Sequence, residues 1–106
     1  RKLMDMKKLM KQAQKMQRDL AIAQEEIKSM EFDASAGGGM VKAVAAGDGS
    51  VKSLEIAPDA VDPEDVEMLQ DMVIAAVNEA LRGVAEMGNQ RMSSVTGGMG
   101  NMGLPF

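Results

Sequence analysis

Residues 31–56 decide the fold, and they read EFDASAGGGMVKAVAAGDGSVKSLEI. The runs Gly37–Gly39 and Gly47–Gly49 are turn signals, because glycine adopts the left-handed backbone conformations that tight turns require. These turns separate three segments of alternating apolar and polar residues, 31–36, 40–46 and 50–56. We therefore predict a three-stranded antiparallel meander with one apolar face rich in small residues, ended by Pro58.

A long helix is predicted before this region. Residues 2–30 contain no glycine or proline, and their apolar residues recur at alternating spacings of three and four. This repeat is typical of a helix that packs along another helix. The predicted seam of contact includes Leu9, Ala13, Met16, Leu20 and Ile27.

A second helix is predicted after the strands. Asp62 is suited to cap it and Pro63 to occupy its first position. The spacing of three and four then runs from Val66 to Met87, and the helix is expected to end by about Thr96. Residues 1–96 are thus predicted to form a single domain, followed by a flexible tail, 97–106, rich in glycine and methionine.

The predicted fold class is α+β, in the order α-β-β-β-α. A compact domain of about 100 residues has a radius of gyration of only about 13 Å, and two helices near 40 Å must project beyond it. Their apolar stripes would then contact water at a cost of about 25 cal/mol per Å². A second copy of the chain is the simplest cover, so we predict a homodimer.

Charge is distributed unevenly along the chain. The net charge is −4, yet residues 1–18 hold seven of the twelve basic residues and one acidic residue, Asp5. A polyanion responds to the local patch within about 8–10 Å and not to the summed charge. On a helical wheel, the bases within residues 6–18 lie almost opposite the apolar seam. This basic stripe consists of Lys7, Lys8, Lys11, Lys15 and Arg18, with no acid between 6 and 18.

The basic stripe predicts a bound anion, because cations near a helix N-terminus are disfavoured by the helix dipole unless something offsets them. DNA and RNA are the abundant candidates, and an acidic protein is a third. The two aromatic residues, Phe32 and Phe106, lie far from the stripe in sequence, which argues against base stacking on single strands. Lysines contact phosphates, and Arg18 alone could read a guanine edge. We therefore expect duplex binding with weak sequence preference.

Composition excludes several other functions. Cysteine and histidine are absent, which removes disulfides, thiol nucleophiles, zinc fingers and imidazole acid–base chemistry. The acidic residues between 55 and 71 lack the ligand spacing of a calcium loop. No nucleophile is paired with a base, so the chain is predicted not to be an enzyme. We expect no metal, cofactor, small-molecule substrate or membrane partner, and a cytoplasmic location.

Several segments, taken in order, resemble the YbaB/EbfC family of bacterial nucleoid-associated proteins. They are Met10–Gln17, Gly39–Lys42, Leu54–Ile56, Asp62–Asp71, Ala75–Ala80 and Thr96–Met99. The resemblance implies a homodimer shaped like tweezers, whose helical arms engage DNA. It also implies a location at the nucleoid and a role in nucleoid organisation or gene regulation. The alternative that the residues leave open is a protein-interaction or chaperone-like adaptor that uses the projecting helices.

Overall fold

The computed structural model describes the backbone of residues 2–103 and the side chains of residues 5–96. Its elements follow the predicted order: α1 Lys2–Ser29, β1 Glu31–Ala36, β2 Val41–Ala46, β3 Val51–Ile56, the short 3-10 helix η1 Pro58–Ala60, and α2 Val66–Gly103. The three strands form one antiparallel sheet in the order β1-β2-β3, which confirms the predicted meander. Each strand begins within one residue of its predicted start, and β3 ends before Pro58 as expected.

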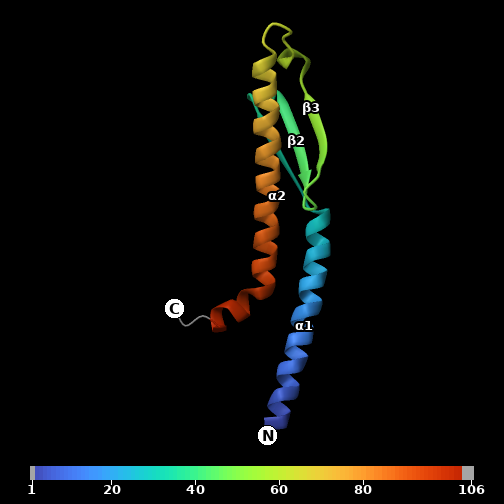
Figure 1. Ribbon diagram of the computed structural model, residues 1–106, viewed down its shortest axis with the longest axis vertical. Coiled ribbons are helices and arrows are strands. Elements are labelled where there is room, and N and C mark those ends of the chain that lie inside the picture. Colours follow the sequence, from blue (N-terminus) through green and yellow to red (C-terminus); the bar gives the residue numbers. More distant parts are fainter. Residues whose placement is uncertain (1, 104–106) are drawn as a thin grey trace.

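The chain is extended. It measures 77 × 29 × 15 Å, and its radius of gyration is 20.9 Å, well above the ~13 Å of a compact domain of this size. Figure 1 shows the reason: α2 lies along the sheet, while α1 leaves the end of the sheet and points away from it. The projection of α1 therefore agrees with the prediction, whereas α2 is the helix that lies along the sheet.

The apolar face of the sheet is packed against α2. On β2, Val41, Ala43 and Ala45 are fully buried, and they form the core together with residues of α2. The α2 residues are Ala76, Ala80 and Val84. Alanine facing alanine lets the helix approach the sheet closely. The core is thin as a result, and Val41 is the largest side chain that is fully buried.

A β-bulge in β3 adds Val51 to the apolar residues of that strand that share this face. Val44 pairs with Ser53, but Ala45 pairs with Val51, so Lys52 is the extra residue. Residues directly opposite each other share a face of a sheet. Leu54, opposite Ala43, and Val51, opposite Ala45, therefore both face the side on which α2 lies.

The start of α2 corrects one prediction. Asp62 does not cap the helix: its side chain accepts a hydrogen bond from the backbone N–H of Glu64 at 2.9 Å, which forms a local turn. The carboxylate of Asp65 accepts instead from the N–H of Met68 at 3.2 Å, the contact of an N-cap residue. The helix accordingly begins at Val66, after Pro63 and not at it.

The end of α2 corrects a second prediction. The helix continues to Gly103, beyond the expected end near Thr96. The hydroxyl of Thr96 donates to the carbonyl of Met92, four residues earlier, at 3.1 Å, so it bonds within the helix and does not cap a helix end. The glycines that follow weaken a helix by about 1 kcal/mol each without ending it. Of the predicted tail 97–106, residues 104–106 and all the side chains lie outside the described part.

Candidate nucleic-acid interface

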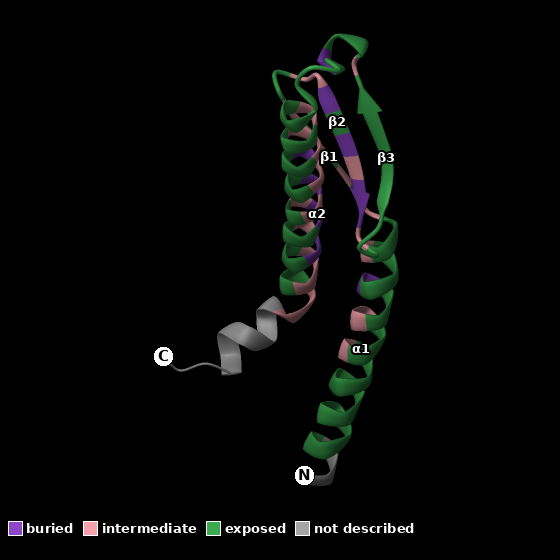
Figure 2. Ribbon diagram, turned by 45° about the horizontal axis from the view of Figure 1, so that its top comes forward, coloured by how far each residue is buried: buried purple, intermediate pink, exposed green. Residues whose placement is uncertain are grey.

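The basic stripe lies on the projecting part of α1, residues 5–18, which we call the arm. Residues 5–15 are all exposed, and Figure 2 shows this part of the helix standing clear of the sheet and of α2. No other element of the described chain packs on it firmly enough to bury a residue. Residues 5–15 of the arm are thus free to meet a ligand.

The stripe residues Lys7, Lys8, Lys11, Lys15 and Arg18 are all exposed. Lys7, Lys11 and Lys15 follow one another at intervals of about 6 Å along the helix axis. Among the side chains described, Lys15 is the only stripe residue in an ion pair, with Asp19 at 3.1 Å. No pattern in the sequence had indicated this pair. Since 71% of the Lys15 side chain remains accessible, the ammonium group is still open to a competing anion.

The predicted seam residues divide into two groups. Met16, Leu20 and Ile27 are half-buried within the single chain, where the second half of α1 lies beside α2. Leu9 and Ala13 are exposed on the arm, and Leu9 is 63% accessible. The first half of the seam therefore has no cover inside one chain.

In addition to these half-buried side chains, two close contacts and one ion pair hold α1 to the rest of the molecule. Gly47 donates its N–H to the carbonyl of Met30 at 2.9 Å, and a β-carbon on Gly47 would lie 1.7 Å from the carbonyl oxygen of Ile27. Gly88 of α2 faces a methyl group of the same Ile27. Both glycines allow backbones to approach more closely than any side chain would permit.

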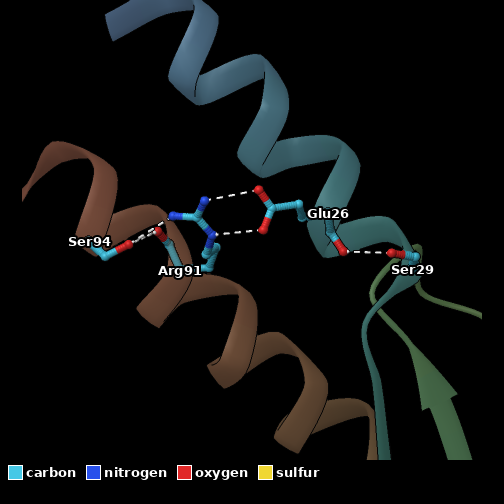
Figure 3. Close-up of polar contacts among 4 residues, drawn as sticks. All are labelled: Glu26, Ser29, Arg91 and Ser94. Atoms are coloured by element: carbon cyan, nitrogen blue, oxygen red, sulfur yellow. Dashed lines mark hydrogen bonds and ion pairs between the residues drawn. The ribbon is translucent and has the colours of Figure 1, made fainter.

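The ion pair joins Glu26 of α1 to Arg91 of α2, and it was not predicted from the sequence. Nη2 and Nε of Arg91 donate to the two carboxylate oxygens of Glu26 at 3.0 and 3.1 Å (Figure 3). The hydrogen bond from Arg91 lowers the pKa of Glu26, and the same contact raises the pKa of Arg91. The pair is therefore fully charged at neutral pH.

These features define a class of protein. A small α+β scaffold carries a helical arm with exposed cations and no acid from residue 6 to 18, the electrostatic pattern of nucleic-acid-binding proteins. Within residues 2–103, neither helix combines the length and apolar character needed to cross a membrane. The chain belongs to the YbaB/EbfC DNA-binding family, whose model matches residues 2–99.

Individual relatives agree with this assignment. The chain is 50% identical to a nucleoid-associated protein of Ruminiclostridium cellulolyticum over 101 residues, which is 95% of this chain and 86% of that protein. It is 55% identical to a nucleoid-associated protein of Acetivibrio thermocellus over 89% of this chain and 83% of that protein. These findings confirm the family resemblance, and the family is a DNA-binding one and not a family of enzymes.

A solved structure supports the fold. The crystal structure of an uncharacterized protein from Helicobacter pylori is 26% identical and superposes with a TM-score of 0.59. The superposition covers 74% of this chain and 90% of the other. The α-β-β-β-α arrangement is therefore shared with an experimentally determined structure.

Proposed function

We propose that this chain binds duplex DNA as a homodimer, with weak sequence preference, and thereby organises the nucleoid or regulates genes. The observation that carries the proposal is the arm: five exposed cations, and no acid from residue 6 to 18, on a helix that extends beyond the rest of the molecule. The relatives' name, nucleoid-associated protein, agrees with this role.

The chemistry of the stripe favours the DNA backbone over the bases. Its four lysines are flexible point charges suited to phosphate oxygens. Arg18 is the only member with the planar fork that pairs with a guanine edge. The exposed Lys15–Asp19 pair is of a kind worth at most about 1 kcal/mol, so a phosphate can displace Asp19. Binding that depends on phosphates has little sequence preference.

The proposal of a homodimer is supported by an apolar surface that one chain leaves uncovered. α2 packs on β1 and β2, so the apolar residues of β3 remain accessible, with Leu54 at 43% and Ile56 at 38%. Beside them lies a groove of about 380 Å³ lined by Ile56, Leu69, Gln70, Val73 and Ile74. Leaving such a surface in water is costly at about 25 cal/mol per Å².

A second copy is the occupant that fits this surface. A two-fold interface needs a patch that is complementary to itself. The chain presents an open apolar groove, and one of the side chains at its wall, Ile74, is 57% exposed. The Ile74 of one chain can then enter the groove of the other. Exposed Leu9 and Met6 on the arm give the same partner a second apolar contact.

Sedimentation equilibrium tests the dimer. We expect a dimer for the unmodified chain and a monomer for Leu54→Glu, which introduces a charge on the uncovered face of β3. Ser53→Glu is the matched control, because the neighbouring residue of the strand points to the opposite face. A monomeric unmodified chain, or equal effects of the two substitutions, would overturn the dimer.

Fluorescence anisotropy with random duplex DNA at low salt tests the interface. We expect the pair Lys11→Glu and Lys15→Glu to weaken binding at least about tenfold and to reduce the salt dependence. The control pair, Lys42→Glu and Lys52→Glu, makes the same change in net charge on the sheet. If the two pairs weakened binding equally, the stripe would not be the binding surface.

A further inference from the structure

We infer that the ion pair between Glu26 and Arg91 is a positioning latch, which fixes the direction in which the arm presents its basic stripe. The inference rests on the proposed function, since the arm matters only if it binds DNA. Neither residue need touch DNA. Both are positioning residues that act through α1.

The geometry of the pair is directional. Arg91 contacts Glu26 through two donors, Nη2 and Nε, at 3.0 and 3.1 Å. Its remaining nitrogen, Nη1, donates to the hydroxyl of Ser94 at 3.0 Å, and that hydroxyl donates to the carbonyl of Arg91 at 2.7 Å. Figure 3 shows the guanidinium held between the two helices in this way. A fork with two bonds adds geometric specificity that a single contact lacks.

This ion pair is also distinct in what it connects. In the described part of the chain, the three other ion pairs each join residues three or four apart in one helix. Glu26 and Arg91 are 65 residues apart and lie on different helices. The pair is partly sheltered, with 32% of the Arg91 side chain and 46% of the Glu26 side chain accessible.

The apolar contacts of α1 do not fix its orientation by themselves. Ala23 is the only residue between positions 5 and 29 that is buried, and its methyl group offers no directional contact. Ile27 is held closely at Gly47, which gives the helix a pivot. Besides this pivot and Ala23, α1 meets α2 through Met16 and Leu20, which are only half-buried, so these contacts leave the helix able to roll about its axis. The fork between Glu26 and Arg91 prevents that roll.

Small changes at the latch become large at the stripe. Lys7 lies about 28 Å along the helix from Glu26, at about 1.5 Å per residue. A swing of about 20° at Glu26 would therefore move Lys7 by about 10 Å, close to the ~12 Å width of the DNA major groove. A roll of α1 would turn the whole stripe away from the duplex.

Latch and stripe also share one surface. A polar groove of about 350 Å³ is lined by Lys15, Asp19, Ile22, Arg91, Ser94 and Val95. Asp19, which pairs with Lys15 of the stripe, lies near enough to Arg91 for its charge to raise the pKa of that residue. Charges of alternating sign thus continue from the stripe into the latch.

The test compares Glu26→Gln with Glu25→Gln. The two substitutions remove the same charge from neighbouring positions, but Glu25 pairs only with Lys28 on its own helix, at 3.3 Å. Removal of an acid should by itself tighten binding to DNA. Loss of the latch should weaken it, so the two effects have opposite signs. We expect Glu26→Gln to weaken binding about two- to fivefold, the range of an accessible pair, and Glu25→Gln not to weaken it.

A distance measurement reports the arm without DNA. The chain has no cysteine. The substitutions Gln12→Cys on the arm and Asn78→Cys on α2 therefore provide the only two attachment sites for spin labels in each labelled chain. The labelled chain is diluted into unlabelled protein so that each dimer carries one labelled copy. We expect Glu26→Gln to broaden and shift the distance distribution, Glu25→Gln to leave it unchanged, and the exchange Glu26→Arg with Arg91→Glu to restore it.

The outcomes separate the two proposals. A distribution that Glu26→Gln leaves unchanged would overturn the latch, even if the chain binds DNA. Equal DNA affinities for Glu26→Gln and Glu25→Gln would overturn its role in binding. Failure of the unmodified chain to bind duplex DNA would instead overturn the proposed function.

Discussion

Gly47 is the position where a single methyl group should disturb the fold most. It joins β2 to the following turn at the point where the end of α1 crosses close to the sheet. A β-carbon there would lie 1.7 Å from the carbonyl oxygen and 2.6 Å from the carbonyl carbon of Ile27. Ordinary contacts of carbon with a carbonyl oxygen are about 3.3–3.6 Å. Gly47→Ala therefore requires α1 and the sheet to separate by more than about 1.5 Å.

The expected cost follows from what the methyl group meets. Overpacking costs about 1–3 kcal/mol when a side chain can rotate away. Here the obstacle is backbone, and the carbonyl of Ile27 already accepts a hydrogen bond from Met30 at 3.0 Å. We expect Gly47→Ala to lower the free energy of unfolding by about 3 kcal/mol. For a domain of this size that lowers Tm by about 12–24 °C.

The control is Gly88→Ala, which meets the same residue in a different way. Its β-carbon would lie 3.2 Å from a methyl group of Ile27, which can adjust. Alanine also stabilises a helix by about 1 kcal/mol relative to glycine, so we expect a net change within about 1 kcal/mol. Urea denaturation at fixed protein concentration measures both variants. If Gly47→Ala were no more destabilising than Gly88→Ala, the close approach at Ile27 would be refuted.

Asp65→Ala should lower the free energy of unfolding by about 1 kcal/mol by removing the N-cap, and equal urea midpoints for Asp65→Ala and Asp62→Ala would contradict the assignment. The folded-state pKa values of Glu26 and Asp48 are lowered, chiefly by hydrogen bonds from Arg91 and Ser50. The stability that these two carboxylates contribute is therefore complete above their ordinary pKa values of 4.5 and 3.8. It is lost as the pH falls through their lowered folded-state pKa values. The free energy of unfolding should decline below about pH 4.5, and it should decline less steeply in the double variant Glu26→Gln with Asp48→Asn. If the double variant had the same pH profile as the unmodified chain, neither carboxylate would be a source of the decline. Finally, if the four stripe lysines of both chains in the dimer reach phosphates, log Kd against log salt should approach a slope of about 7, and anisotropy titrations giving a slope below about 2 would contradict extensive phosphate contact.

The strands were predictable because their signals are local. Glycine turns and a period of two mark the ends and faces of strands in the sequence itself, and each strand begins within one residue of its expected start. The start of α2 was less predictable, because Asp62 and Asp65 are both suited to capping. Only the turn that Asp62 forms with Glu64 decides between them. The end of the helix was missed because glycine is a weak indicator of termination.

The candidate site was predictable in part for the same reason. The basic stripe is a helical spacing of charges, which the sequence contains directly. The pairing of Glu26 with Arg91 depends on how two distant helices cross, and no local pattern encodes it. Likewise, alternation showed that β3 has an apolar side, but not that α2 would cover only the other two strands.

The alanine-rich core has a consequence for how the protein exists in a cell. Few large side chains are fully buried within one chain, and much of the large apolar surface lies where we propose that the second copy binds. Folding and association would then be one process governed by mass action. Dilution alone would lower the midpoint temperature of unfolding. A newly synthesised chain would gain much of its stability only when it associates with a second copy.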